Sequence, residues 1–273
     1  MIAERTRVSG EWLDLREPAD VAARDAELVE SLRRHLSSTD CLVIHDLGCG
    51  TGSMGRWLAP LLPGPQNWVL HDRDEDLLDA AAAEHPGPAA DGASVSVETR
   101  ASDIALLQAD ELADATIITA SALLDLLTRD ELDGLIDVCM KAACPVLLSL
   151  SVVGRVDLVP ADPVDSRVAA AFDLHQRRMT ERGRLLGPDA VAAAVEGFRQ
   201  RGAKVLLRPT PWRLGAAEAD LAAEWFTGWI GAACEQSLEL ASETVSYARR
   251  RLAEARAGEL AVTVGHADLL VLP

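Results

Sequence analysis

Short apolar runs alternate with amphipathic segments along the first half of the chain. Each run is rich in apolar or β-branched residues, and each is followed by apolar residues at helical spacing. A repeated βα order predicts an α/β fold with a doubly wound, mostly parallel sheet, which binds ligands at the carboxyl ends of its strands. The predicted strands span residues 41–47, 67–72, 94–100, 114–120 and 144–152.

The second half of the chain has a less regular pattern and predicts additional helices. Residues 204–212 predict an edge strand, because proline lacks the N–H that an inner strand needs. Residues 260–273 predict a final strand pair or one long strand. The predicted helices span residues 163–182, 187–203, 216–236 and 243–257. Near the amino terminus, residues 16–36 predict one amphipathic helix with Pro18 in its first turn.

A glycine-rich stretch, HDLGCGTGSMG, follows the first predicted strand and precedes a helix. Glycines in such a turn let backbone amides approach a bound nucleotide closely. Residues 50–55 match the G-x-G-x-x-G pattern of dinucleotide-binding oxidoreductases, whereas residues 48–52 match G-x-G-x-G after an acidic strand end. Asp72 ends the second predicted strand and suits a ribose-binding carboxylate in both patterns. The spacing therefore leaves both cofactors open.

The charge and the cysteines narrow the class of protein. A formal net charge of −17 repels polyanions at long range, so neither nucleic acid nor an anionic membrane is an expected partner. The 5 cysteines form no C-x-x-C pair, which argues against a disulfide framework or a zinc site and predicts a cytoplasmic protein. No signal peptide, membrane span or metal site is predicted.

Taken together, VIHDLGCGTG and VLHDRDEDLL resemble the first two motifs of the class I S-adenosylmethionine-dependent methyltransferases. RASDIALL places Asp103 just after the third predicted strand, where that family has a polar residue beside the adenine amine. VTVGHADLLVLP suits the seventh, antiparallel strand of the family. The resemblance covers residues 40–151 by motif and the rest by topology. It implies a seven-stranded, Rossmann-like sheet and S-adenosyl-L-methionine as the cofactor.

The resemblance also implies which residues contact the cofactor. The glycine turn faces the methionine moiety and the sugar, Asp72 binds the ribose, and the other positions frame the adenine or lie beneath the sulfonium. The implied cofactor-binding residues are Gly48, Cys49, Gly50, Gly52, Asp72, Arg73, Asp103, Ile104 and Ser121. For Arg73, a solvent-exposed surface charge is an equally good interpretation.

The expected organisation is a single methyltransferase domain over residues 1–273, because no linker-like segment divides the chain. Many relatives fold an amino-terminal helix over the cofactor, so Trp12 and Arg16 are the candidates for such a lid. The expected parts are a helical lid over 1–39, a cofactor-binding core over 40–152, and cap insertions over 153–187 and 215–258.

The segment FDLHQRRMTERGRLLGP follows the fifth predicted strand and is expected to cap the pocket. Its Arg177 and Arg178 are candidates for binding a carboxylate or another anionic group of the substrate. His175 is a candidate general base, since its ordinary pKa suits proton removal near neutral pH. Asp125 is a second catalytic candidate near the acceptor. A solvated arginine face and a helix N-terminal carboxylate are the structural alternatives.

The acceptor class follows mainly from what the chain lacks. TASALLDLL replaces the N/D-P-P-Y/F motif of amine and amide methyltransferases, and Cys144 precedes a proline where cytosine-C5 enzymes need it to follow one. We therefore expect methyl transfer to a small molecule. The alternatives are an RNA or protein methyltransferase, which the arginines of YARRRLAEAR would serve, and a catalytically inactive binding protein. The sequence does not predict the acceptor atom or the oligomeric state.

Overall fold

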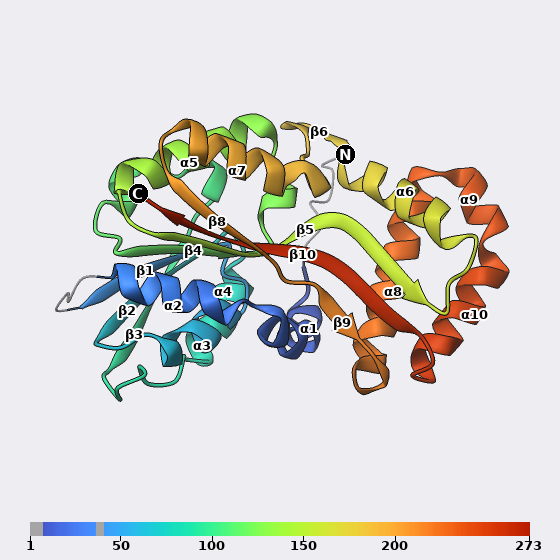
Figure 1. Cartoon of the computed structure of the whole chain (residues 1–273), viewed down its shortest axis with the longest axis horizontal. Coiled ribbons are helices and arrows are strands. Elements are labelled where there is room, and N and C mark those ends of the chain that lie inside the picture. Colours follow the sequence, from blue (N-terminus) through green and yellow to red (C-terminus); the bar gives the residue numbers. More distant parts are fainter. Residues whose placement is uncertain (1–7, 37–40) are drawn as a thin grey trace.

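A twisted sheet runs through the computed structural model, which describes residues 8–36 and 41–273 (Figure 1). Its strand order is β3-β2-β1-β4-β5-β10-β8, and β9 pairs with β10 beyond the end of β8. The strands are β1 (Leu42–Leu47), β2 (Gln66–Asp72), β3 (Val95–Ala101), β4 (Ile117–Ser121), β5 (Val146–Val159), β8 (Lys204–Pro209), β9 (Trp212–Leu214) and β10 (Ala261–Leu272).

The pairing confirms the predicted sheet and chooses between the two expectations for its last strand. The first five strands run parallel to one another, and β10 runs antiparallel to both β5 and β8. Residues 261–272 form one long strand and not a pair. The inner strands are apolar on both sides because helices cover both faces.

Helices sandwich this sheet (Figure 1). The lower face in that view carries α2 (Ala26–His35), α3 (Ser53–Leu58) and α4 (Glu75–Ala83), and the upper face carries α5 (Arg129–Ala142) and α7 (Ala190–Gln200). Short 3-10 turns connect several elements: η1 (Ala59–Leu61), η2 (Ile104–Leu106), η3 (Ala109–Leu112), η4 (Leu124–Leu126), η5 (Gly187–Asp189) and η6 (Ala216–Glu218).

A helical cap extends the molecule beyond the parallel part of the sheet, on the right in Figure 1. It consists of α6 (Asp165–Gln176), α8 (Ala219–Gln236), α9 (Leu238–Glu243) and α10 (Val245–Arg256). These helices share a core of buried aromatic side chains that includes Trp225, Phe226 and Trp229. Strand β5 is longer than predicted because it continues beside β10 into this cap, where Val159 pairs with Ala261.

The amino-terminal segment forms two helices, so the prediction of one helix over 16–36 was wrong. Helix α1 (Gly10–Ala23) begins where the side chain of Ser9 accepts from the N–H of Trp12, and Pro18 lies inside it instead of in its first turn. The chain turns at Asp25, whose side chain caps α2 by accepting from the N–H of Leu28 at 2.8 Å. Residues 1–7 and 37–39 of the predicted lid lie outside the described residues.

The helix predicted over 163–182 is also shorter than expected. It ends at Gln176, and a two-stranded hairpin of β6 (Met179–Thr180) and β7 (Gly183–Arg184) follows it. Gly183, with a φ of +124°, makes this hairpin, and the hydroxyl of Thr180 donates to its carbonyl at 2.8 Å. Glycine adopts this positive φ without strain, which suits the hairpin that replaces the end of the predicted helix.

One buried ion pair joins two cap helices and gives a stability prediction. Arg251 of α10 is 2% exposed and donates to both carboxylate oxygens of Asp165 on α6 at 2.9 and 2.7 Å. Tyr247 donates to the same carboxylate at 2.6 Å. Arg251→Met leaves this carboxylate without its cation and is expected to lower the free energy of unfolding by about 3 kcal/mol.

Thermal or denaturant unfolding checks this value against a neighbouring variant. Arg250 is half exposed and pairs with Asp162, so Arg250→Met should cost less than about 1 kcal/mol. Equal losses in the two variants would contradict the importance of burial for this pair.

Candidate functional site

The glycine turn after β1 has the conformation that only glycine adopts without strain. Gly48, Gly50 and Gly52 have φ values of +67°, +55° and +84°. The N–H of Gly52 bonds back to the carbonyl of Cys49 at 2.9 Å, and α3 begins one residue later, at Ser53. The turn therefore brings backbone amides and a helix N-terminus to the carboxyl end of the sheet.

Asp72 closes the same site from the end of β2. One of its oxygens accepts from the N–H of Gly50 at 3.0 Å, and the other accepts from the N–H of Asp74 at 3.0 Å. The carboxylate is half-buried and held in place by these two bonds. Each oxygen retains a lone pair for a further donor, such as a ribose hydroxyl.

Asp46, the last acidic residue of β1, is the most deeply buried carboxylate beside the turn. It is 1% exposed, and its Oδ1 accepts from the hydroxyl of Thr119 at 2.7 Å. Its Oδ2 has no hydrogen-bond partner within residues 8–36 and 41–273. Burial raises the pKa of Asp46 to about 6, and the Thr119 bond and the charge of Arg24 oppose this rise.

Because its pKa is raised, ionised Asp46 is expected to lower the free energy of unfolding at neutral pH, and Asp46→Asn should remove this loss. The native state holds the proton more tightly than the unfolded chain, whose value is 3.8, so stability falls as pH rises from about 4 to about 6. The full cost above that window is roughly 3 kcal/mol. Denaturant unfolding of the ligand-free protein should show Asp46→Asn more stable than the wild type at pH 7 and about equal at pH 4. The same difference at both pH values would contradict the titration of Asp46.

Helix α1 covers this site directly. A cavity is bounded on one side by the glycine turn and Asp46 and on the other by three residues of the helix, Leu13, Arg16 and Asp20. A Cβ added to Gly50 would lie 3.0 Å from the Cδ1 of Leu13. Arg16, a candidate for the lid, therefore lines the cavity, and its role over a cofactor stays a prediction.

Two contacts hold α1 in this position. Asp20 accepts from Arg16 at 3.0 Å and from the indole N–H of Trp212 on β9 at 2.9 Å. Arg56 of α3 pairs with Glu17. Trp12 lies against Trp212, with ring centroids 6.4 Å apart, and does not line the cavity.

The other predicted cofactor residues are distributed unevenly around the cavity. Cys49 and Ser121 line it. Asp103 accepts from the N–H of Ala105 at 3.1 Å and begins η2, while Ile104 packs on the core. Arg73 is exposed. The roles of these residues toward an adenine ring stay predictions.

Asp125 lies in η4 in an environment that suits proton transfer. Burial raises its pKa to about 6, and the positive charges of Arg16 and Arg178 act in the opposite direction. Asp125, Arg16 and Arg178 therefore lie near enough to one another for their charges to interact.

Asp125 does not line the cavity, and the other acceptor candidates also make their contacts outside it. The Nε2 of His175 lies 3.1 Å from a carboxylate oxygen of Glu235 on α8. Arg177 donates to both oxygens of Asp189 at 2.6 and 2.8 Å. Arg178 donates to the carbonyl of His175 at 3.3 Å. None of the three lines the cavity beside the glycine turn, and their proposed roles stay predictions.

Arg24 is a residue of the site that the sequence did not indicate. It lies between α1 and α2, is 5% exposed, and donates to the hydroxyls of Ser53 and Ser121, both at 3.2 Å. Arg24 was missed because the sequence predicted one uninterrupted helix over residues 16–36, which includes it. The signal for the break is Asp25, a residue type that favours a helix N-cap.

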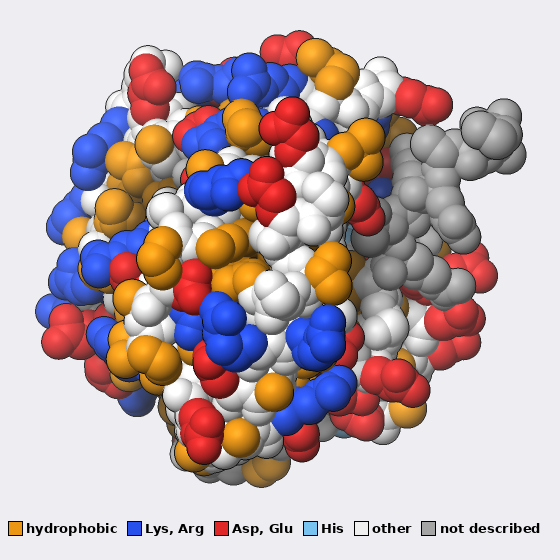
Figure 2. Space-filling view, turned by 90° about the vertical axis from the view of Figure 1, so that its right-hand side faces the viewer, with side chains coloured by type: hydrophobic (Ala, Val, Ile, Leu, Met, Phe, Trp, Pro, Cys, Tyr) orange, Lys and Arg blue, Asp and Glu red, His pale blue; other side chains and the backbone are white. Residues whose placement is uncertain are grey.

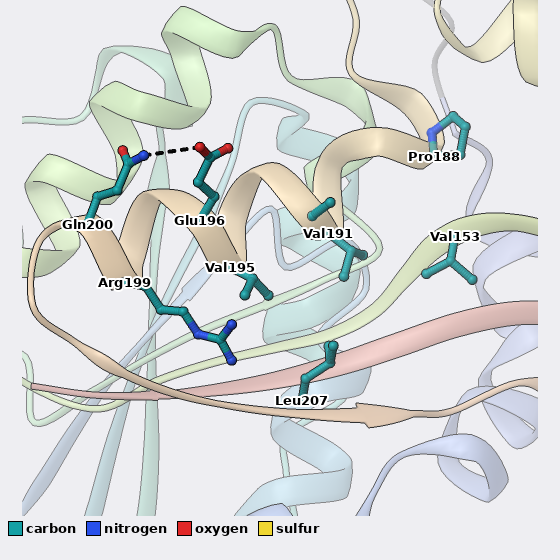
Figure 3. Close-up of a pocket in the computed structure, with 9 residues that line it drawn as sticks. Val153, Pro188, Val191, Val195, Glu196, Arg199, Gln200 and Leu207 are labelled. Carbon is teal, nitrogen blue, oxygen red and sulfur yellow. Dashed lines mark hydrogen bonds between the residues drawn. The ribbon is translucent and has the colours of Figure 1, made fainter.

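Two further surfaces lie away from the cavity beside the glycine turn. A groove between α7 and β8 is lined by apolar side chains such as Val191, Val195 and Leu207, and it shares no lining residue with the cavity beside the glycine turn (Figure 3). The outer face of the cap mixes basic, acidic and apolar side chains (Figure 2). On α10, Arg250 and Arg251 are paired with carboxylates.

Within residues 8–36 and 41–273, no helix is long and apolar enough to cross a bilayer. The same residues contain no group of three or more potential metal ligands.

Two solved structures, a cyclopropane synthase and a cyclopropane synthase-like protein, have an architecture similar to that of this chain. The cyclopropane-fatty-acyl-phospholipid synthase-like protein of Lactobacillus casei matches at a TM-score of 0.54 with 13% identity, over 96% of this chain and 92% of that one. Cyclopropane synthase MmaA2 of Mycobacterium tuberculosis matches at 0.49 with 14% identity, over 96% and 94%. The sequence matches no protein-family model and no curated protein. The first structural match and the strand order show that this chain has the class I methyltransferase fold.

Proposed function

We propose that the protein is an S-adenosylmethionine-dependent methyltransferase that acts on a small molecule. The observation that carries this proposal is the arrangement at the carboxyl ends of β1 and β2. There the turn with Gly48, Gly50 and Gly52 meets the fixed carboxylate of Asp72 and the buried Asp46.

The residues present fit this cofactor. The positive φ of Gly50 and the nearness of Leu13 leave no room for a side chain, as expected where a ligand approaches the backbone. Asp72 has lone pairs for the two vicinal hydroxyls of a ribose. The unpartnered oxygen of Asp46 suits a cationic group. When bound, the cofactor supplies an activated methyl group on a sulfonium.

A small acceptor is supported by the cover over the cavity. Leu13, Arg16 and Asp20 of α1 stand over the glycine turn and restrict access to it. Two of the arginines of α10 that would serve an RNA, Arg250 and Arg251, are paired with carboxylates, and the net charge of the chain is −17. The 5 cysteines, all within the described residues, are free, and we place the protein in the cytoplasm on that basis.

Asp125 is the residue that we propose to remove a proton from the acceptor. Methyl transfer needs orientation first, and a base where the nucleophile carries a proton. Burial raises the pKa of Asp125 to about 6, opposed by a backbone hydrogen bond and by the charges of Arg16 and Arg178, so Asp125 is mostly ionised at neutral pH. Arg178 additionally has guanidinium donors suited to an anionic group of the acceptor. His175, bonded to Glu235, is the alternative base.

Release of S-adenosylhomocysteine tests the acceptor class. The protein is incubated with S-adenosylmethionine and either a small-metabolite fraction, total RNA or a protein fraction. We expect product only with the small metabolites. Product with RNA alone, lost at raised salt, would support the RNA methyltransferase alternative instead.

The role of Asp125 predicts a pH profile. The rate with an identified acceptor should rise with pH up to about 6 and then level off, because the base must be deprotonated and its pKa is about 6. Asp125→Asn should lower kcat by about 100-fold and abolish this rise. The exposed Asp130→Asn on α5 is the matched control. An unchanged profile in Asp125→Asn would exclude Asp125 as the base.

A further inference from the structure

Two histidines contact each other inside the sheet, one in β1 and one in β2. His45 and His71 are both 0% exposed, their ring centroids lie 5.2 Å apart, and the Nδ1 of His45 lies 3.0 Å from the Nε2 of His71. Burial is the main cause that lowers the pKa of both rings, and that of His71 falls to about 4. Besides Asp114, the charged side chains that act on the rings are Glu98 and Arg100 of β3, which pair with each other at 2.8 Å. Both rings are therefore neutral at pH 7.5, and each has one N–H donor and one acceptor nitrogen.

A polar group at each end extends the two histidines into a chain of four side chains. The Nε2 of His45 lies 3.1 Å from a carboxylate oxygen of Asp114, whose side chain is 62% exposed. The Nδ1 of His71 lies 3.1 Å from the hydroxyl of Ser102, which directly follows β3. The chain thus runs from the surface, through the sheet, to the segment that contains Asp103.

The carboxylate of Asp114 fixes the direction of every hydrogen bond in this chain. An ionised carboxylate only accepts, so the Nε2 of His45 carries the hydrogen and its Nδ1 accepts. The Nε2 of His71 must then donate to His45, which leaves the Nδ1 of His71 to accept from Ser102. The hydroxyl of Ser102 therefore directs its one hydrogen at His71 and not at the carbonyl of Arg100, 3.5 Å away.

The same chain connects three segments of the candidate site. The carbonyl of His71 accepts from the N–H of Cys49 in the glycine turn at 2.9 Å. The N–H of Ser102 donates to the carbonyl of Asp72 at 2.9 Å. Ser102 also precedes Asp103, whose side chain caps η2. A hydroxyl of Ser102 that is held in one orientation therefore ties the segment after β3 to the strand ends that carry the glycine turn and Asp72.

We propose that the His45–His71 pair, acting through Ser102, positions the segment beside the adenine of the cofactor. Asp114 sets the direction of the hydrogen bonds from its place at the surface. This inference rests on the proposed function, because it takes the segment after β3 as the one that faces the adenine. All four are positioning residues, since none of them lines the cavity beside the glycine turn.

Removal of the last hydroxyl tests the role of this chain in binding. In calorimetric titrations of the full chain with S-adenosylhomocysteine at pH 7.5, Ser102→Ala should raise Kd by about 5-fold, because one hydrogen bond that orients the segment is lost. Ser102→Thr retains the hydroxyl and should bind within about 2-fold of the wild type. Ser96→Ala removes an exposed hydroxyl from β3 and is the matched control, which should bind like the wild type.

The direction of the hydrogen bonds is read from the ring nitrogens of the histidines. Correlation NMR of these nitrogens at pH 7.5 should show His45 and His71 neutral, each with its hydrogen on Nε2. An amide in place of the carboxylate can either accept or donate, so Asp114→Asn should give a mixture of the two neutral ring forms. Its affinity for S-adenosylhomocysteine should lie between those of the wild type and Ser102→Ala. The exposed Asp110→Asn of η3 removes a negative charge outside the chain and should change neither the ring forms nor the affinity.

Other outcomes overturn the inference in distinguishable ways. A wild-type Kd in Ser102→Ala would overturn it and leave the proposed function intact. Equal weakening in Ser102→Ala and Ser102→Thr would overturn it as well, because the hydroxyl would not be responsible for the loss. Unmixed ring forms in Asp114→Asn would contradict the direction assigned to the chain. A wild type that does not bind S-adenosylhomocysteine would overturn the proposed function, and the inference with it.

Discussion

Asp72→Ala is expected to weaken the binding of S-adenosylhomocysteine by about 100-fold or more. The carboxylate is fixed by the N–H groups of Gly50 and Asp74, and hydrogen bonds from neutral donors to a charged acceptor are worth about 1.5–3 kcal/mol each. Loss of two such bonds to ribose hydroxyls therefore accounts for roughly two orders of magnitude in Kd. Calorimetric titration measures the loss.

Two companion variants show whether this loss comes from the carboxylate itself. Asp72→Asn retains one acceptor oxygen and should lose less affinity than Asp72→Ala. The exposed Glu75→Ala at the start of α4 removes a nearby negative charge without touching the turn and should bind like the wild type. If Glu75→Ala lost as much as Asp72→Ala, general electrostatics and not ribose recognition would explain the effect.

Gly50→Ala is expected to reduce S-adenosylhomocysteine binding by at least about 10-fold. Alanine at a φ of +55° is strained by about 1 kcal/mol, and its Cβ would press on Leu13, 3.0 Å away. Gly50 and Leu13 both line the cavity, so the methyl group also narrows it. Binding and thermal unfolding are measured together, since the strain affects the second and the narrowing of the cavity affects the first.

Gly64→Ala is a matched control for this substitution. Gly64 also has a positive φ, +84°, but nothing lies within 4 Å of its Cβ position. Gly50→Ala should therefore lose more stability than Gly64→Ala, which has the backbone strain without the contact, and only Gly50→Ala should lose binding. Adding Leu13→Ala to Gly50→Ala should restore part of the stability, because it removes the contact from α1. Wild-type affinity in Gly50→Ala would mean that the ligand does not approach this turn.

The sheet was predictable because its signals are local. Each parallel strand is a short apolar run, and the positive-φ positions of the turn fall on glycines that are visible in the sequence. The carboxylate of Asp72 was predictable for the same reason, since it ends a strand next to the one that leads into the turn. The glycines of the turn and Asp72 could therefore be predicted without knowledge of contacts between distant segments.

The cover of the site depends on contacts between distant segments and could not be derived in this way. Arg24 reaches Ser121 across 97 positions of sequence, and Trp212 reaches Asp20 across 192. Helical periodicity continues through residues 16–36, so the break at Asp25 is decided by its bond to Asp268 on β10 as well as by capping. The tertiary contact overrides the local pattern.

The candidates for catalysis illustrate the same limit. His175 and Asp125 are both residue types that can act as a base. Their surroundings become visible only in the structure, where His175 contacts Glu235 and the positive charges of Arg16 and Arg178 lower the pKa of Asp125 against the effect of burial. Arg177 likewise is engaged by Asp189. The sequence identifies residues that can act as a base, and the structural environment of each residue distinguishes between these candidates.

The most direct test of the central claim is calorimetric titration of the wild-type protein with S-adenosylmethionine, S-adenosylhomocysteine and NAD in parallel. The glycine turn, Asp46 and Asp72 predict Kd values on the order of micromolar for the two adenosyl-sulfur compounds and no binding of NAD. Binding of NAD without either of the other two would contradict the account. It would then assign residues 50–55 to a dinucleotide and remove the basis for methyl transfer.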